Sequence, residues 1–293
     1  MNLLKPCIVC GQAQHKLFSY QSHDYFRCMA CGLVSTYPYP SEAKILEHYT
    51  KGFDEGNYYR LRTWSAQYMQ IYKGMAVFLK QSMAAYGLDL EGAKVLDIGC
   101  FTGDFIEVLD SEGAEAYGIE LQSRAVEIAN ERFPGRVYQT DVFDSTLPKS
   151  QFDVISMLGL IEHVTEPVNL LRRVTDILEP GGILLIQTPN SGSLLASLLR
   201  RFWPPYAPIE HIHLFSRQSL ETALSQLGIG QLNFKPHWKW LPVGYVYNNL
   251  QIFGPEFFRL ATPFFRMFGR IINNWRLPFY GGEMLIVGRK QED

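Results

Sequence analysis

Four of the five cysteines form two closely spaced pairs near the N-terminus. The pairs are Cys7-x-x-Cys10 and Cys28-x-x-Cys31, and Gly32 follows the second pair. This spacing is close to that of zinc ribbons, in which thiolates on two tight turns converge on one tetrahedral ion. A short segment with little core of its own also needs the stability that such an ion supplies. The four cysteines are therefore predicted to hold a structural Zn²⁺, because a site closed by protein ligands leaves no position for catalysis.

A second chemically informative stretch reads VLDIGCFTGDF. It indicates a buried strand that ends in Asp97, then a turn in which Gly99 and Gly103 let a ligand approach the backbone, then a helix start. Glu120 ends the next short strand, at roughly the ~20-residue spacing that places a carboxylate on ribose hydroxyls. Phe101 stands where a dinucleotide-binding fingerprint has its second glycine. The stretch therefore predicts a nucleotide-shaped site that differs from the usual NAD site.

The elements that must position these residues alternate between strands and helices. Strands are expected at 95–97, 117–120, 137–139, 152–158, 183–187 and 283–288, and helices at 103–112, 122–132 and 170–178. A longer helix is expected over 60–83, within a stretch that is helical in pattern from Ser41 to Tyr86. Such alternation predicts an α/β fold with a mainly parallel sheet.

These segments resemble class I S-adenosylmethionine-dependent methyltransferases over nearly the whole chain. The motif around Asp97 is similar to the family's D-x-G-x-G-x-G, with Phe101 in place of the middle glycine. The phrases IEHV at 161–164, LEPGG at 178–182 and TPN at 188–190 stand in the family's order. The resemblance implies a Rossmann-like, mainly parallel seven-stranded sheet.

The N-terminal cysteine pairs resemble the zinc ribbon of some sugar and secondary-metabolite methyltransferases. The expected domains are a zinc ribbon over 1–40, a helical lid or linker over 41–90 and a cofactor-binding domain over 91–293. Insertions around 191–212 and 238–281 are expected to cap the acceptor pocket. Tyr58 and Tyr59 are candidates to face the methionine end of the cofactor from the lid.

The resemblance implies S-adenosylmethionine as methyl donor and S-adenosylhomocysteine as product. The residues expected to bind the donor lie at successive strand ends. They are Asp97, Ile98, Gly99, Cys100 and Gly103 around the methionine, Glu120 on the ribose hydroxyls, Leu121, Asp141 and Val142 at the adenine, and Leu158 near the sulfonium. Cys100 reads as a small turn residue rather than a nucleophile.

Methyl transfer to oxygen or carbon needs alignment of donor and acceptor and the removal of a proton. The candidate bases are His163, which follows Glu162, and the nearby pair His211 and His213. For Glu162 and His163 a structural role fits the pattern equally well. Ubiquinone-type O-methyltransferases carry a further Glu that is proposed as part of a metal site, and Gly159 stands there, so no catalytic metal is predicted.

The segment from Trp238 to Tyr280 is unusually aromatic. Phe257, Leu260, Ala261, Phe264, Phe268 and Ile271 keep helical spacing, and Arg259, Arg266 and Arg270 point elsewhere. Pro263 is expected to bend or divide this helix. An acceptor pocket, contact with an anionic membrane face, and a core or dimer contact all fit this pattern.

Composition restricts the function further. The formal net charge of −2 gives no general attraction to nucleic acid, and residues 1–40 carry only Lys5, Lys16 and Arg27 as firm cations. No apolar run reaches the ~20 residues of a membrane span, and the N-terminus lacks a signal-peptide core, so we expect a cytoplasmic protein with peripheral contact at the inner membrane face left open.

The leading hypothesis is methylation of a small molecule, with a sugar or a glycan- or lipid-linked hydroxyl or carbon as acceptor. The alternatives are an RNA-modifying methyltransferase or nucleic-acid-binding protein that uses the ribbon, and a non-catalytic cofactor-binding module.

Overall fold

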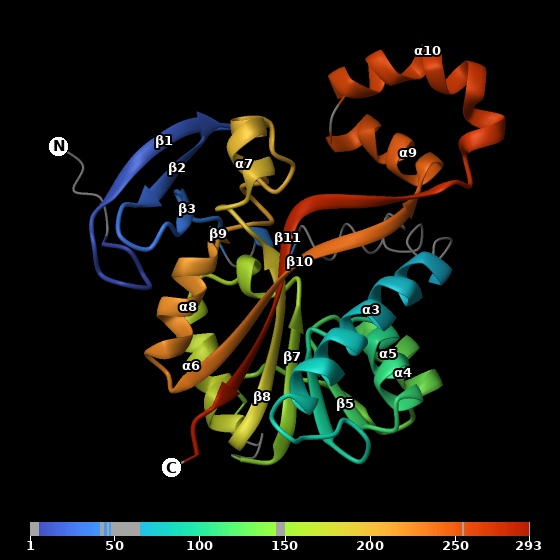
Figure 1. Ribbon diagram of the computed structural model, residues 1–293. Coiled ribbons are helices and arrows are strands. Elements are labelled where there is room, and N and C mark those ends of the chain that lie inside the picture. Colours follow the sequence, from blue (N-terminus) through green and yellow to red (C-terminus); the bar gives the residue numbers. More distant parts are fainter. Residues whose placement is uncertain are drawn as a thin grey trace.

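Two sheets organise the chain (Figure 1). The computed structural model describes residues 6–41, 44, 45, 47, 65–144, 150–253 and 255–292, and of 65–67, 249–253 and 255–257 it describes the backbone alone. The larger sheet has seven strands in the order β10-β11-β8-β7-β4-β5-β6. Its strands are β4 (Lys94–Ile98), β5 (Glu115–Glu120), β6 (Val137–Gln139), β7 (Phe152–Leu158), β8 (Leu178–Pro189), β10 (Ile229–Pro242) and β11 (Arg276–Lys290).

The strands β4 to β8 are parallel, and β11 runs antiparallel to both β8 and β10. This topology confirms the expected Rossmann-like, mainly parallel seven-stranded sheet. Because parallel strands end at the same edge, the ends of β4, β5 and β6 lie next to one another at one edge of the sheet.

Helices cover both faces of this sheet. The helices α3 (Ser65–Ala84), α4 (Asp104–Ser111) and α5 (Ser123–Arg132) lie on one side, and α6 (Pro167–Ile177) and α8 (Arg217–Ser225) on the other (Figure 1). Side chains alternate between the two cores as strand geometry requires. Val95 and Val154 pack with α3 to α5, and their neighbours Leu96 and Ile155 pack with α6 and α8. Both faces of the parallel strands are therefore buried, which explains their nearly continuous apolar runs.

The smaller sheet has four strands and includes a distant part of the chain. It contains β1 (Gln14–Tyr20), β2 (His23–Cys28), β3 (Val34–Tyr37) and β9 (His213–Leu214) in that order. β3 pairs antiparallel with β9, so that Ser35 lies opposite His213. The N-terminal ribbon is therefore hydrogen-bonded to the large domain, and the expected boundaries at residues 40 and 90 stay predictions.

Several expected elements differ in extent. α6 begins at Pro167, since proline suits a first helical turn, and β8 already begins at Leu178, which pairs with Phe152. The expected helix over 60–83 is described only from Ser65, and the lid candidates Tyr58 and Tyr59 lie outside the described residues.

The two insertions carry helices of their own. The first contains α7 (Leu194–Leu199) and η2 (Arg200–Phe202), and the second contains α9 (Val243–Phe253) and α10 (Pro255–Ile272). A short helix, η1 (Ile161–His163), lies outside both and follows β7. α10 runs through Pro263 as one helix, so the proline does not divide it. In the described part of the chain, no helix combines the length and apolar character needed to cross a bilayer.

Candidate functional site

The turn after β4 has the backbone geometry that lets a ligand approach the main chain closely. Gly99 and Gly103 adopt φ angles of 74° and 79°, which favour glycine, and Gly103 caps the N-terminus of α4. Phe101 also has a positive φ of 49°, so this side chain sits in a conformation that the family's glycine would adopt without strain. The departure noted in the sequence thus changes the residue type at this position and keeps a left-handed turn.

Glu120 ties this turn to the end of β5. One carboxylate oxygen, Oε1, accepts hydrogen bonds from the backbone N–H groups of Leu121 (2.8 Å) and Gln122 (3.0 Å). The other, Oε2, accepts from the Phe101 N–H at 3.0 Å. The carboxylate is thereby held at the strand end between two loops, with lone pairs remaining for a ligand's hydroxyl donors.

An exposed apolar surface lies beyond Glu120, at the ends of β5 and β6. Leu121 is 61% exposed, and Phe143 is also exposed. Asp141 follows β6 and accepts a hydrogen bond from the Phe143 N–H at 2.9 Å, while Val142 is buried. Large exposed side chains beside a strand-end acid suit the face of an adenine ring, although the roles expected for these residues stay predictions.

Asp97 is a buried acid beside a small side chain. Its Oδ1 accepts a hydrogen bond from Ser156 Oγ at 2.6 Å. Burial raises the pKa of Asp97 to about 7, with Ser156 acting against the rise and Glu120 adding to it. Burial also raises the pKa of the Cys100 thiol, which keeps it protonated and unreactive. Cys100 lies against Gly118, where an added Cβ would come within 2.4 Å of the sulfur.

Helix α3 passes over this site. Tyr72 packs against Phe105 with ring centroids 5.8 Å apart, and burial together with Asp104 and Asp97 raises its pKa. Tyr68, one turn earlier, hydrogen-bonds the hydroxyl of Tyr245 at 3.1 Å. The described part of the expected lid therefore lies between the turn after β4 and the second insertion.

Glu162, His163 and His211 converge at the end of β7. Their ligand atoms all lie within 4.8 Å of one another. His163 and His211 each donate Nδ1–H to a backbone carbonyl, that of Glu210 (2.6 Å) and that of Pro205 (2.7 Å). Each ring is thus oriented with Nε2 unprotonated in the neutral form, an arrangement that serves either proton transfer or metal binding.

The electrostatics of this cluster follow from its burial. Burial raises the pKa of Glu162, with His211 lowering it and Glu283 raising it further. Burial also lowers the pKa of His211, and the neighbouring His163 adds to this effect. The sequence predicted no catalytic metal, whereas two imidazoles and a carboxylate this close together are a ligand set that fits a divalent cation, which would polarise an acceptor hydroxyl there.

His213 lies apart from this cluster, within β9. Its Nδ1 is 2.9 Å from Ser35 Oγ and its Nε2 is 3.2 Å from the Thr165 carbonyl, so both ring nitrogens already have partners. The side chain is fully buried, and burial lowers its pKa to about 4. This geometry favours a structural link between ribbon and sheet over the expected role as general base.

A further titratable group, missed in the sequence, lies on the hairpin of β10 and β11. Glu283 accepts hydrogen bonds from Lys239 Nζ (2.6 Å) and Gln187 Nε2 (2.7 Å), and His237 Nδ1 lies 3.2 Å from its Oε2. Burial would raise the pKa of Glu283, but Lys239 and His237 outweigh it and hold the pKa at about 2. Gln187 also lies beside Gly159, next to Leu158, where the sulfonium is expected.

The spacing His237-x-Lys239 on a strand was the available signal, because residues two apart share a face. The sequence instead suggested an insertion over 238–281 and a last strand over 283–288, and gave no sign that residues 237–239 pair with that strand.

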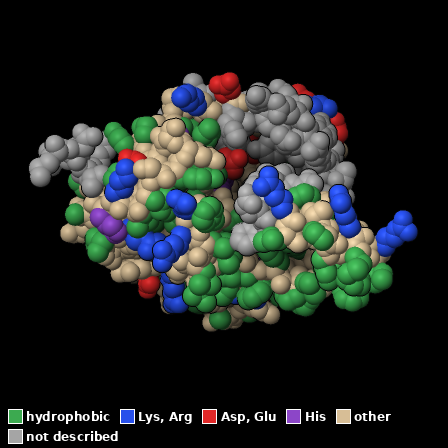
Figure 2. Space-filling model, turned by 90° about the horizontal axis from the view of Figure 1, so that it is seen from above, with side chains coloured by type: hydrophobic (Ala, Val, Ile, Leu, Met, Phe, Trp, Pro, Cys, Tyr) green, Lys and Arg blue, Asp and Glu red, His purple; other side chains and the backbone are tan. Residues whose placement is uncertain are grey.

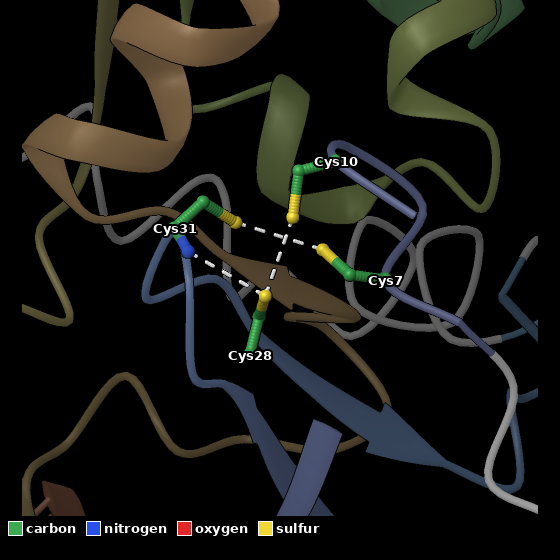
Figure 3. A group of neighbouring side chains, drawn as sticks. All are labelled: Cys7, Cys10, Cys28 and Cys31. Atoms are coloured by element: carbon green, nitrogen blue, oxygen red, sulfur yellow. Dashed lines mark hydrogen bonds between the residues drawn. The ribbon is translucent and has the colours of Figure 1, made fainter. Parts of the chain in front are cut away.

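The four cysteines form the second candidate site (Figure 3). Their sulfurs point toward a common centre, with Cys7 Sγ 3.6 Å from Cys31 Sγ and Cys10 Sγ 3.4 Å from Cys28 Sγ. Zinc–sulfur bonds of ≈ 2.3 Å at tetrahedral angles require sulfurs roughly 3.8 Å apart. The cluster therefore fits structural zinc, held by the turn before β1 and the turn after β2.

A Rossmann-like sheet with acids at adjacent strand ends and a glycine turn is the architecture of nucleotide-cofactor-binding domains, among them those of class I methyltransferases. A sequence-family model described as Methyltransferase domain matches residues 71–229, which is more than half of the chain. The chain belongs to this methyltransferase family.

Curated relatives cover a smaller part of the chain. A ubiquinone biosynthesis O-methyltransferase of Leptothrix cholodnii is 31% identical over 108 residues, which are 34% of this chain and 46% of the relative. The same-named protein of Azoarcus sp. is 27% identical over 165 residues, 50% of this chain and 70% of the relative. The chain spans about half the length of the first of these relatives.

Solved structures support the fold. A methyltransferase from Thermotoga maritima superimposes with a TM-score of 0.52 at 18% identity, covering 84% of this chain and 98% of that one. A methyltransferase from Galdieria sulphuraria gives a TM-score of 0.51 at 15% identity, covering 76% and 86%.

Proposed function

We propose that this protein transfers a methyl group from S-adenosylmethionine to a small-molecule acceptor. The observation that carries the proposal is the placement of Asp97, Glu120 and Asp141 at the ends of β4, β5 and β6, which are neighbours in the sheet of a methyltransferase-family fold. A ligand lying across these three strand ends would meet one carboxylate at each of them. A nucleoside with a charged tail has three groups that such carboxylates can bind, namely the tail, the ribose hydroxyls and the base.

In this proposal each acid has one task. Asp97 would hold the ammonium of the methionine moiety, Glu120 would accept both ribose hydroxyls, and Asp141 would accept from the adenine amine. Leu121 and Val142 would flank the adenine, and Leu158 would face the sulfonium. The remaining expected contacts, Ile98, Gly99, Cys100 and Gly103, would shape the turn that admits the methionine.

Calorimetry with S-adenosylmethionine, S-adenosylhomocysteine and NAD tests the cofactor. We expect both sulfur nucleotides to bind and NAD to fail. Glu120→Ala should weaken binding about tenfold or more, because charge-assisted hydrogen bonds to two hydroxyls are lost. Glu127→Ala is the matched control, since Glu127 is exposed and pairs with Arg124 on α5. Tight binding of NAD with no binding of S-adenosylmethionine would refute the proposal.

We propose that the acceptor proton is removed at the wall formed by the Glu162, His163 and His211 cluster and the His237–Glu283 pair. Burial keeps both His211 and His237 neutral near pH 7, with their pKa values lowered. His237 donating Nδ1–H to Glu283 would leave Nε2 to accept a proton, while Glu283 positions the ring. Turnover at saturating cofactor should be compared for His211→Ala, His213→Ala and His237→Ala. Only the variant that lacks the general base should lose turnover while it keeps the unfolding free energy of the wild type.

We also propose a sugar or a glycan- or lipid-linked hydroxyl or carbon as acceptor, with the protein at the inner membrane face. The layout of cysteine ribbon and methyltransferase domain and the apolar second insertion support it. The names of the curated relatives favour a second candidate, O-methylation of a ubiquinone precursor. Transfer of labelled methyl to polyprenyl-linked sugars, soluble sugars and phenolic ubiquinone precursors distinguishes the two, because each predicts label in a different product.

A further inference from the structure

The outer face of α10 has no protein partner among the residues that the structure describes. An apolar stripe (Leu260, Phe264, Met267, Phe268 and Ile271) recurs at i, i+4, i+7, i+8 and i+11, which is one face of a helix. Leu260 is 79% exposed, Met267 69% and Ile271 67%. Large side chains this exposed in one continuous row mark a contact surface rather than a core.

The opposite face of the same helix is already satisfied. Tyr247 of α9 stacks on Phe265 with ring centroids 3.8 Å apart and contacts Phe258 at 4.8 Å. Its hydroxyl lies 3.1 Å from Thr262 Oγ1. The inner aromatic residues of α10 therefore hold it against α9. Because that face is packed, the apolar stripe on the opposite face points outward.

Charge gives the character of the partner. From Trp238 to Gly282 the chain has five Lys and Arg and a single Glu, whereas the whole chain has a net charge of −2. Arg259, Arg266 and Arg270 recur at i, i+7 and i+11, so they form a separate exposed row beside the stripe. On the right of Figure 2, hydrophobic side chains gather over this part of the molecule with Lys and Arg at their margin. The partner should be apolar inside and anionic at its surface.

We propose that the apolar stripe of α10 docks on an anionic lipid bilayer, with Arg266 and Arg270 at the level of the lipid phosphates. Interfacial helices of this kind bury a narrow apolar face to the headgroup boundary and use basic residues for attraction. Exposed Trp238, Trp240 and Trp275 at the base of the hairpin suit the same interface, where indole rings are enriched.

A second copy of this chain fits the surface less well. Two stripes packed face to face would bring Arg266 and Arg270 of both copies together, and the single acid of α10, Glu256, lies in the first turn of the helix, far along the sequence from them. Like charges across an interface oppose association, whereas anionic headgroups satisfy them.

Docking on a bilayer does not depend on the proposed function, but its role does, since that role is to bring a membrane-held acceptor near the site. The contact between Tyr245 of α9 and Tyr68 of α3 joins the hairpin to the helix that covers the cofactor end. Docking at α10 would therefore place the acceptor side of the protein against the bilayer.

Flotation of the full chain with vesicles tests the proposal. Vesicles of phosphatidylcholine with about one-third phosphatidylglycerol should bind the protein, and pure phosphatidylcholine should bind it far less. Leu260→Asp and Ile271→Asp should each lower binding about tenfold or more. Val77→Asp, an exposed apolar position on α3, is the matched control and should bind as the wild type does.

Charge variants complete the test. Arg266→Gln with Arg270→Gln should lower binding to anionic vesicles roughly 25-fold, at about fivefold for each basic residue, and Lys73→Gln should leave it unchanged. Wild-type protein that fails to bind anionic vesicles, or binds neutral ones equally, would overturn the proposal. So would a dimer, measured by light scattering, that Leu260→Asp dissociates while vesicle binding is absent. Cofactor affinity of the same variants, measured by calorimetry, reports separately on the proposed function.

Discussion

Asp97 is a candidate cofactor-binding residue whose ionisation changes near neutral pH. Burial raises its pKa to about 7, so near neutrality a large fraction of the carboxyl is protonated in the free protein. In the proposed site the ionised form holds a cationic ammonium, and binding at lower pH must therefore release a proton.

We expect S-adenosylmethionine affinity to fall about tenfold between pH 8 and pH 6, because the ionised fraction of Asp97 falls by that factor. Calorimetry in two buffers of different ionisation enthalpy would detect the released proton. Ser156→Ala should move the midpoint to higher pH, since the hydroxyl at 2.6 Å stabilises the anion. Ser111→Ala, on α4, is the control, and an affinity that does not change with pH would contradict this role.

The pKa of Glu283 is shifted in the opposite direction from that of Asp97, and the shift affects the stability of the fold rather than cofactor binding. Its folded pKa of about 2 lies below the usual carboxyl value of 4.5, chiefly because Lys239 and His237 outweigh the cost of burial. A lowered pKa gives stability that is present above pH 4.5 and is lost as the pH falls toward 2.

Urea unfolding should show this difference between pH 7 and pH 3. To remove the titration of His237, the comparison is His237→Gln against His237→Gln with Glu283→Gln. The single variant should lose about 1–2 kcal/mol more unfolding free energy than the double variant over this interval. Glu221→Gln, at an exposed position on α8, should leave the change in unfolding free energy between pH 7 and pH 3 as it is in the wild type. An equal change in the single and the double variant would exclude an ion-paired Glu283.

At the scale of elements, the cysteine cluster and β9 behave as one unit. β3 pairs with β9, and Ser216 Oγ, at the start of α8, donates a hydrogen bond to the Cys31 carbonyl at 2.8 Å. Cys28 and Cys31 also belong to the same apolar cluster as Phe215 and Leu220. A change at the metal should therefore reach α8.

Removal of zinc by a strong chelator, or Cys28→Ser, should release one metal ion and reduce amide protection over residues 213–225. Metal analysis and hydrogen exchange measure the two effects. Cofactor affinity should change by less than about threefold, because β4 and β5 belong to the seven-stranded sheet and not to the four-stranded sheet that holds the ribbon and β9. Unchanged protection in 213–225 would show that the ribbon is independent. A second metal that is lost in His211→Ala would instead identify the Glu162, His163 and His211 cluster as a cation site.

For the whole molecule, the second insertion is an appendage of the β10–β11 hairpin. Pro242 and Arg276 are directly paired, and the Val243 N–H donates to the Trp275 carbonyl at 2.8 Å, so the strands meet where the helices begin. α9 and α10 can thus be removed without cutting a strand of the sheet.

Replacement of residues 243–275 by Asn-Gly should give a folded protein, because this dipeptide closes a two-residue hairpin. We expect cofactor affinity to be kept, unfolding free energy to fall by only about 1 kcal/mol through loss of the Tyr68–Tyr245 hydrogen bond, and vesicle binding to disappear. Calorimetry, urea unfolding and flotation measure the three properties. Vesicle binding that survives the deletion would place the membrane contact elsewhere.

Sequence alone determined the features that are local in the chain. Apolar runs predicted the strands of the parallel sheet, and segments with helical periodicity between them predicted the helices that cover it. Both signals lie within a short stretch of sequence and need no distant residue. The acids Asp97 and Glu120 were placed at strand ends for the same reason, and the cysteine spacing predicted one cluster. The limits of α6 and β8 were less accurate, because a strand begins where a distant partner such as Phe152 is available.

Only the tertiary structure decided which distant residues meet. His213 became a link to Ser35, and His237 met Glu283 across two antiparallel strands, in each case through a contact that no local pattern encodes. The outward direction of the α10 stripe was likewise open in the sequence, where an acceptor pocket, a membrane contact and a core or dimer contact all fitted the pattern. It was decided by Tyr247, because one face of an amphipathic helix is exposed only when the other has already been packed.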